Sequence, residues 1–355
     1  MFSRGKMWSR RLLLLLAVSP TLAFSAAGQV SLLSWNILAP QWATPAKYPW
    51  AKAAGDLAWP AREKRIVQQI ADADADVVCL QECSVEHWSG LYAALQREGY
   101  DGVLQEVKAG HPYTNAVLLK RGQLELVRSE SRSRALITVL RACSAPAAPP
   151  LYLANVHLEA GGGKEEAATR LFQVRSLLRR IELQCEADEA RADASSSPRP
   201  VPLVIAGDLN CDRSSGLHEL LVSGRLAPEH PAAASEAAAE AAPPEMAGYT
   251  HPLLPLVDAY ASTPPPWGPP LRSSQRSGRL LDFIFVSSPA VSVLRTRPVA
   301  KEAGSTRPHQ LPHRAQPSDH LPIGALLSWE GAPASWDGGH RPAWQQLYVQ
   351  NVAER

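Results

Sequence analysis

The chain has 355 residues, of which 45% are hydrophobic, so it can form one large α/β domain or two ordinary ones. Its formal charge is +2, and it falls to −2 without the 27-residue leader identified below, which argues against a generic polyanion-binding protein. The five cysteines include no C-x-x-C pair, and they indicate neither a zinc site nor a disulfide framework.

The first 27 residues have the order of a secretory signal peptide: four basic residues, the apolar run Leu12 to Val18, then small residues. Removing them would leave 32 basic residues against 34 acidic ones, a formal charge of −2. Because no acid precedes Asp56, a plastid or mitochondrial transit peptide and an uncleaved anchor stay open as alternatives. We expect no stable membrane span after leader removal, since the apolar run is short for a bilayer.

The first half of the remaining chain predicts a β-α-β start, with a strand at 29–38, a helix at 59–76 and a buried strand at 77–82. A second helix is expected around 85–97. Short polar turns then separate four apolar runs that we interpret as antiparallel strands, at 100–107, 114–120, 124–130 and 135–143.

The second half continues with a strand at 150–160, a long amphipathic helix at 164–184 and a strand at 202–210. A late hairpin and a final strand within 316–329 follow. The Ala- and Pro-rich stretches 227–247 and 262–278 are predicted to be flexible loops, and no fold is predicted for the tail 330–355. About ten strands with few helices predict an α+β fold: two packed, mainly antiparallel sheets with helices outside, in one domain at 28–329.

Polar side chains that could bind a metal or take part in catalysis recur where these strands begin or end. Residues two apart on a strand share a face, so Asp208 and Asn210 are expected to point the same way, as are Asn155 and His157. Four further strand ends carry such groups, at Asn36, Glu82, Asp282 and the pair Asp319 and His320.

Each of these residues has an ordinary alternative explanation. Asp208 can cap a turn, Glu82 can cap the helix from 85 or face solvent, and His157 can be a satisfied core histidine. Asp282 can pair with Arg279. Independent turns, however, have no reason to place several acids, amides and histidines together at the ends of buried strands, so the conjunction favours a shared site.

Several common chemistries lack their motifs. The sequence has no G-x-S-x-G and no H-E-x-x-H, and the "GGGK" at 161–164 is followed by Glu165 where a P-loop needs Ser or Thr. Carboxylate and amide oxygens suit a hard cation, Mg²⁺ or Mn²⁺, that leaves positions open for a phosphate oxygen. A histidine beside such an ion can move a proton or donate to a phosphoryl oxygen.

Six motifs in order, "SWN", "LQE", "NVH", "GDLN", "LDFIF" and "SDHLP", make the chain resemble the endonuclease/exonuclease/phosphatase (DNase I-like) superfamily from about residue 30 to 329. Within it the sequence is most similar to the carbon-catabolite-repressor-type deadenylases, nocturnin and the Angel proteins. The resemblance implies a four-layer α-β-β-α sandwich that hydrolyses phosphodiesters with Mg²⁺.

The resemblance also implies roles for the site residues. Glu82 would be the main Mg²⁺ ligand, with Asn36 and Asp319 close by. Asp208 and Asn210 would position the attacking water or a second ion and the scissile phosphate. His157 would donate to a phosphate oxygen, and His320, oriented by Asp282, would act as general base or stabilise the transition state. The choice between Asp208 and His320 as acceptor of the water's proton stays open.

The predicted function is a 3′-5′ exoribonuclease of the deadenylase-like type, with RNA or another phosphodiester as substrate. A phosphatase or phosphodiesterase acting on a nucleotide, inositol or lipid head group is the first alternative, and a catalytically inactive binding protein with the same fold is the second. Asn155 and Trp267 are the predicted substrate contacts, although a tryptophan among prolines is as often a surface packing residue. The leader favours a secretory location, and no protein partner is predicted.

Overall fold

The computed structural model describes residues 29–51, 55–106, 110–191, 200–226, 248–262, 274–299 and 310–330. The predicted leader, the loop 227–247, Trp267 and the tail beyond 330 lie outside the described residues.

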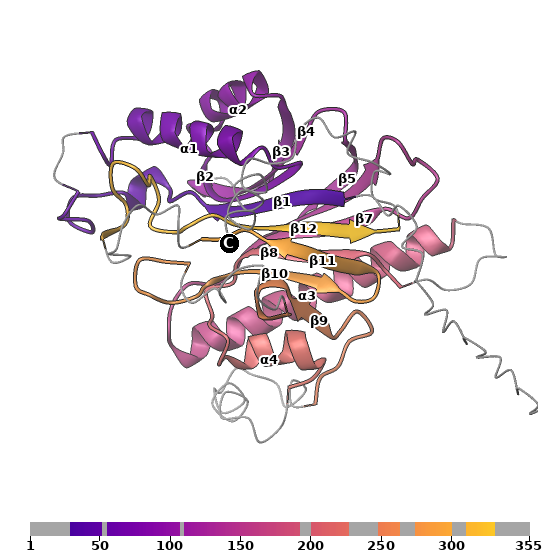
Figure 1. Cartoon of the computed structure of the whole chain (residues 1–355). Helices are drawn as coiled ribbons and strands as arrows, with labels where there is room; N and C mark the ends of the chain where they lie inside the picture. The colour runs from indigo at the N-terminus through magenta and orange to yellow at the C-terminus, as the bar shows by residue number, and fades with distance from the viewer. Residues whose placement is uncertain are drawn as a thin grey trace, which may run out of the picture.

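Two six-stranded sheets form the centre of the molecule (Figure 1). In spatial order, the first sheet consists of β11 (Val291–Thr296), β12 (Ile323–Trp329), β1 (Gln29–Asn36), β2 (Val77–Ser84), β4 (Tyr113–Lys120) and β3 (Tyr100–Leu104). The second consists of β5 (Leu124–Ser131), β6 (Ala135–Ala142), β7 (Leu151–His157), β8 (Leu203–Asp208), β10 (Asp282–Ser287) and β9 (Leu256–Asp258). Only the pairs β1–β2 and β7–β8 are parallel among these strands, which confirms the predicted α+β fold of two mainly antiparallel sheets.

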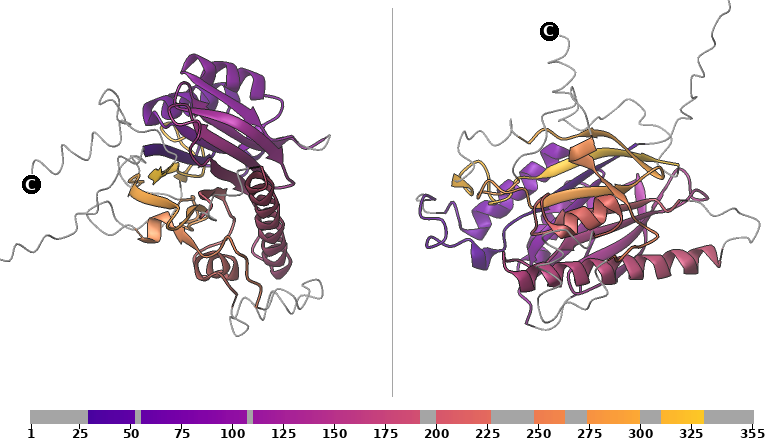
Figure 2. Two further views of the ribbon diagram at one scale, coloured as in Figure 1. Left: turned by 90° about the vertical axis from the view of Figure 1, so that its right-hand side faces the viewer. Right: turned by 90° about the horizontal axis from the view of Figure 1, so that it is seen from below.

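Helices cover the outer face of each sheet and complete four layers (Figures 1 and 2). The first sheet is covered by α1 (Trp59–Ala73) and α2 (Trp88–Arg97), and the second by α3 (Lys164–Glu189) and α4 (Gly216–Ser223). Two short helices, η1 (Pro40–Trp42) and α6 (Ala259–Ser262), lie in connections. None of the described helices combines the length and the apolar character needed to cross a bilayer.

Both faces of the central strands are buried, which explains why they read as continuous apolar runs. On β1, Leu32 packs in the cluster that includes the second sheet, and the next residue, Leu33, packs with Ile66 and Ile70 of α1. Side chains alternate across a strand, so each pair of neighbours serves two layers.

Two segments next to His320 are held by specific contacts. The stretch 262–278 is described at residue 262 and from 274 onward, and there Gln275 forms an isolated bridge with His320. In the segment before β12, Leu311 is fully buried, and the carbonyl of Ala315 accepts a hydrogen bond from Gln69 of α1. The chain on both sides of His320 is therefore held in place.

Candidate active site

Three adjacent strands of the second sheet align polar residues in one row. His157 at the end of β7 is the register partner of Asp208 at the end of β8, and Asp208 is the partner of Asp282 at the start of β10. The parallel β7–β8 pair places both carboxyl ends together, and the antiparallel β10 places its amino end beside them. The sheet topology therefore brings together residues that lie far apart in the sequence.

Gly207 makes this alignment possible. Its φ is +146°, and a Cβ at this position would lie 2.0 Å from the carbonyl oxygen of Val156 on β7. Only glycine allows the two strands to approach this closely. The "GDLN" motif thus needs its glycine for the packing of β8 against β7, one residue before Asp208.

The first sheet contributes Asn36 and Glu82. The register of β2 shifts between Leu80 and Cys83, and Glu82 within this bulge has φ +58°, a conformation that a bulge uses to redirect a side chain. The Asn36 amide donates at 3.0 Å to Glu82 Oε1 and at 3.0 Å to Asp208 Oδ2. One amide group therefore connects carboxylates from both sheets.

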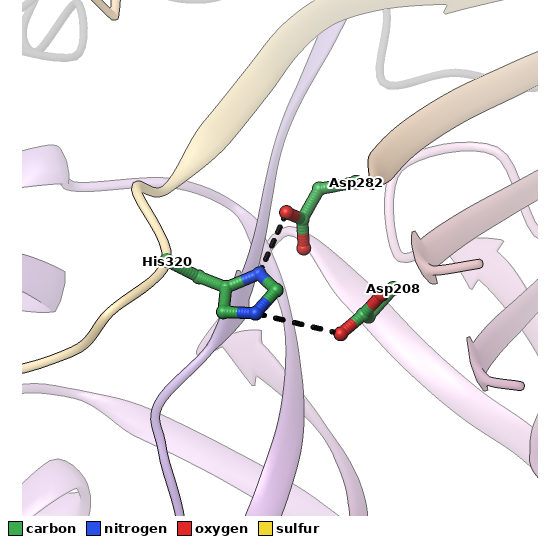
Figure 3. Close-up of side chains that lie close together, drawn as sticks. All are labelled: Asp208, Asp282 and His320. Atoms are coloured by element: carbon green, nitrogen blue, oxygen red, sulfur yellow. Dashed lines mark hydrogen bonds and ion pairs between the residues drawn. The ribbon is translucent and has the colours of Figure 1, made fainter. Parts of the chain in front are cut away.

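Two imidazoles flank the Asp208 carboxylate. His320 Nε2 lies 3.7 Å from Asp208 Oδ2, and its Nδ1 lies 2.8 Å from Asp282 Oδ2 (Figure 3). His157 Nε2 lies 3.8 Å from Asp208 Oδ2 and 3.9 Å from Glu82 Oε1. Both Nε2 atoms thus lie beside the same carboxylate oxygen, and the predicted orientation of His320 by Asp282 is present.

The electrostatics of this cluster favour a charged His320. Burial lowers the pKa of His320, but attraction by Asp282 and Asp208 and the hydrogen bond to Asp282 outweigh burial and raise the pKa well above its ordinary value. Burial also raises the pKa of Asp282, against the opposing effect of the neighbouring imidazole. His320 is therefore available as a hydrogen-bond donor at neutral pH.

The backbone around His320 is fixed by four hydrogen bonds that join it to β1 and to its own loop. Trp35 Nε1 and Gln316 Nε2 both donate to the His320 carbonyl at 3.0 Å. The Ser318 hydroxyl accepts from the His320 amide at 3.1 Å and donates to the Asn36 carbonyl at 2.6 Å. These contacts explain why "SDH" can present a buried imidazole directly before β12.

Arg62 of α1 was not predicted as part of this support. Its side chain is fully buried; Nε donates to the Pro317 carbonyl at 2.7 Å, and a terminal nitrogen donates to the carbonyls of Ile37 and Leu38. Burial lowers its pKa to about 10. The sequence feature that could have identified Arg62 is its position four residues before Ile66, which places it on the buried face of the helix.

The donor set fits a divalent cation. Within the described residues, the ion-pair partners of Glu82 and Asp208 are histidines only, and no lysine or arginine lies within ion-pair distance of either carboxylate. Ligand atoms of Asp208, Asp282 and His320 lie within 4.8 Å of one another, but Asp282 already binds the His320 ring. Glu82 is the less buried of the two carboxylates, with 13% of its side chain exposed against 2% for Asp208, and its oxygens are of the type that a hard cation prefers.

Asn36 and Asn210 are positioned to orient carboxylates. The side-chain oxygen of Asn36 accepts from the Leu38 amide at 3.0 Å, which leaves its nitrogen toward Glu82 and Asp208. The Asn210 backbone amide donates to Asp208 Oδ1 at 2.9 Å, and its side chain donates to the Leu158 carbonyl. Both residues lie in the cluster, as predicted from their motifs.

Asp319 has different neighbours from those expected of a metal ligand. Its Oδ2 accepts from the Tyr48 hydroxyl at 2.9 Å and from Gln275 Nε2 at 3.2 Å, and Arg276 Nε lies 3.8 Å away. A carboxylate oxygen with these three partners is already satisfied. The structure therefore gives Asp319 a role in anchoring the loop that contains Tyr48, whose aromatic side chain no sequence pattern marked.

Asn155 is a correction to the predicted substrate contacts. Its side chain is fully buried, and its amide nitrogen donates to the carbonyls of Leu80 and Ala116 in the first sheet. Its oxygen accepts from Gln81 Nε2 at 2.8 Å. Residues on one strand face can still lie at different depths, and Asn155, two residues further from the edge than His157, joins the sheets instead of reaching substrate.

A cavity of about 460 Å³ lies between the start of β6 and the helix α3, and the catalytic cluster does not line it. Leu158, the residue after His157, lines it together with residues that include Arg132, Arg134 and His111. Arg134 is paired with Glu159 at 2.5 Å. The cavity is large enough for a nucleotide and has a mixed, partly basic wall.

Comparison with known proteins agrees with this geometry. Residues 33–320 match the model of the Endonuclease/Exonuclease/phosphatase family. Carbon catabolite repressor protein 4 homolog 2 of Arabidopsis thaliana is 28% identical over 285 residues, which cover 67% of this chain and 44% of that protein. The CCR4-Not complex 3'-5'-exoribonuclease subunit Ccr4 of Schizosaccharomyces pombe is 22% identical over 247 residues, 56% of this chain and 35% of the relative. The chain thus spans less than half the length of these two relatives.

Solved structures share the fold. ANGEL2, described as a 2',3'-cyclic phosphatase and solved with adenosine-2',3'-vanadate, superposes with a TM-score of 0.65 at 21% identity, covering 86% of this chain and 96% of that one. The human nocturnin catalytic domain gives a TM-score of 0.54 at 19% identity, covering 85% and 94%. With the family model matching across both sheets and the site, the chain belongs to the endonuclease/exonuclease/phosphatase family.

Proposed function

We propose that this protein is a Mg²⁺-dependent 3′-5′ exoribonuclease of the deadenylase-like type. One observation carries the proposal: the Nε2 atoms of His157 and His320 lie 3.8 and 3.7 Å from the same oxygen, Asp208 Oδ2, and Glu82 and Asn36 lie in the same cluster. Two imidazole donors around a carboxylate and a cation ligand match the needs of phosphoryl transfer. The name of the Schizosaccharomyces pombe relative, a 3'-5'-exoribonuclease subunit, supports the choice of reaction.

Each side chain has a role that follows from its contacts. Glu82, oriented by Asn36 and by the Ala39 amide at 2.7 Å, would hold the cation. A bound Mg²⁺ supplies positive charge that offsets the charge developing on the phosphoryl oxygens. His157 donates from Nε2 to a phosphoryl oxygen. His320, protonated beside Asp282, stabilises the developing charge, which leaves Asp208 to accept the proton of the attacking water.

A phosphatase is the second candidate, because ANGEL2 is described as a 2',3'-cyclic phosphatase. A cyclic phosphate at the end of an RNA can enter the same cluster as an internal phosphodiester, because hydrolysis of either one needs the same contacts to the phosphoryl oxygens. The inactive binding protein has less support, because the cluster keeps its carboxylates and both histidines.

Incubation of leader-free protein with Mg²⁺ and a substrate panel tests the proposal. The panel contains oligo(A), mixed RNA, RNA ending in a 2',3'-cyclic phosphate, DNA, NADP and phospholipids. We expect stepwise shortening of RNA from the 3′ end, with loss of activity in Glu82→Ala and His320→Ala. Intact RNA beside a released small phosphate would replace the nuclease with a phosphatase, and activity unchanged in both variants would reject the site.

We also propose that residues 1–27 direct the protein to the secretory pathway, from the order of basic, apolar and small residues. Amino-terminal sequencing of protein from its native host should then begin near Gly28. An intact Met1 would reject cleavage, and accumulation in a plastid or mitochondrion would favour the transit-peptide alternative.

A further inference from the structure

An exposed apolar surface lies next to the cluster, formed by Trp42, Val85 and Tyr113, which we call the aromatic shelf. Trp42 is 45% exposed and Val85 is 41% exposed, two of the five large hydrophobic side chains exposed among the described residues. Trp42 and Tyr113 pack edge to face with ring centroids 6.4 Å apart. The Val85 amide donates to the carbonyl of Pro112, the residue that precedes Tyr113, so Val85 and Tyr113 belong to adjacent segments.

The shelf continues directly into the catalytic residues. The Tyr113 ring lies 6.0 Å from the His157 ring, and His157 Nε2 lies within 3.9 Å of both Glu82 and Asp208. Both strands explain this: Ser84 at the end of β2 is the register partner of Tyr113 at the start of β4. A group resting on Trp42 would therefore lie two ring contacts from His157.

Charge on the shelf comes from Lys47. Its ammonium lies 5.9 Å from the centre of the Trp42 ring, and its side chain is exposed. A flat neutral ring with one cation over it suits a ligand that has both a π-face and a phosphate, because the ring offers a stacking surface and the ammonium offers a positive charge. Sugar phosphates and inositol phosphates have no π-face and would leave Trp42 unused.

We propose that the aromatic shelf binds the unpaired base of a nucleotide that flanks the scissile phosphate. This inference rests on the proposed function and names the single-stranded substrate that the site would select. Base stacking on an aromatic residue is tolerant of sequence, so the shelf favours unpaired strands without choosing a base. It assigns Trp42 to substrate positioning, with Lys47 next to the sugar-phosphate backbone.

A double-mutant cycle tests the inference in the full-length protein: it combines substitution of Trp42 with removal of a base from the substrate. The substrates are a 3′-labelled oligo(A) and oligonucleotides in which one of the two nucleotides flanking the scissile phosphate is abasic. The variants are Trp42→Ala, Trp42→Phe and, as matched control, Leu183→Ala, which removes a 37% exposed side chain from α3. We expect Trp42→Ala to raise KM for oligo(A) about tenfold with little change in kcat. Trp42→Phe and Leu183→Ala should stay near wild type.

The abasic substrate separates stacking from a structural effect. Wild type should lose about tenfold on one abasic substrate, and Trp42→Ala should lose nothing further. If Trp42→Ala lost as much activity relative to wild type on the abasic substrates as on intact oligo(A), or lost none on intact oligo(A), the proposed role of the aromatic shelf would be wrong. The same cycle measured by fluorescence anisotropy in EDTA keeps the shelf testable if no RNA is hydrolysed, an outcome that would instead count against the proposed function. Binding of lipid vesicles lost in Trp42→Ala, without an effect on oligonucleotides, would assign the surface to a membrane.

Discussion

Substitution of Asn36 by aspartate should make the stability of the protein depend on a divalent cation. In the structure the Asn36 amide donates at 3.0 Å to both Glu82 Oε1 and Asp208 Oδ2. Asn36→Asp removes both hydrogen bonds and places a third carboxylate at the same distance from the other two. None of the described lysines and arginines forms an ion pair with Glu82 or Asp208, so without a bound cation the three carboxylates would repel one another.

The magnitude follows from these contacts. Two hydrogen bonds to charged acceptors contribute about 1.5–3 kcal/mol each, so their loss costs about 3–6 kcal/mol. Repulsion between carboxylates at this distance adds to that loss, although uptake of a proton by one of the three limits it. We therefore expect a fall of at least about 6 °C in the melting temperature of Asn36→Asp in EDTA at pH 8. Mg²⁺ or Mn²⁺ should restore most of it, because a third carboxylate strengthens a hard-cation site.

Thermal unfolding in EDTA, in MgCl₂ and in KCl of equal ionic strength is the assay, since KCl accounts for screening alone. Asn36→Ala is the matched control: it loses the hydrogen bonds, adds no charge and should gain no more from Mg²⁺ than wild type. The reasoning fails if Asn36→Asp is as stable as wild type in EDTA, or if Mg²⁺ stabilises it no more than it stabilises Asn36→Ala.

Three further changes test other parts of the site. Asp282→Asn should lower kcat about 100-fold with little change in KM, because His320 loses the negative charge that orients its ring and keeps it protonated. A rise in KM with unchanged kcat would contradict this role. Arg62→Met leaves three buried carbonyls without their donor and should lower the free energy of unfolding, measured with urea, by about 3 kcal/mol or more. Burial raises the pKa of Asp258, but its hydrogen bonds to His218 and Arg213 outweigh burial and lower it. The resulting stabilisation is present above about pH 4 and is lost as pH falls through the lowered pKa, so Asp258→Asn should flatten the acid limb of stability against pH, and an unchanged limb would contradict this.

The long strands and helices could be predicted because their signals are local. The helix α1 and the strand β2 follow from apolar period, and the alternation on β1 explains its two buried faces. The short β9 and α6 escaped prediction because three or four residues carry too little periodicity. The extent of α3 was underestimated by five residues, from 184 to Glu189, because polar residues continue its last turn.

The site residues that could be predicted from the sequence are those that lie at the ends of recognisable strands. His157 and Asp208 converge because strand register aligns the ends of β7 and β8, whereas Glu82 reaches them from the bulge of β2 in the other sheet. Depth and side-chain partners were not predictable, because they depend on the packing of one sheet against the other. The hydrogen bond between Asp319 and Tyr48, 271 positions away in the sequence, is an example of such a partner.

The buried amide of Asn155 has a consequence for how the enzyme can fail. Asn36 and Glu82 come from one sheet and His157 and Asp208 from the other, so the spacing of the reacting groups equals the offset between two layers. Packing of aliphatic side chains resists separation of the layers but tolerates sliding, whereas the directional bonds from Asn155 to Leu80 and Ala116 do not. Inactivating substitutions in this protein are therefore expected in the interior as well as at the surface of the site, in chains that still fold.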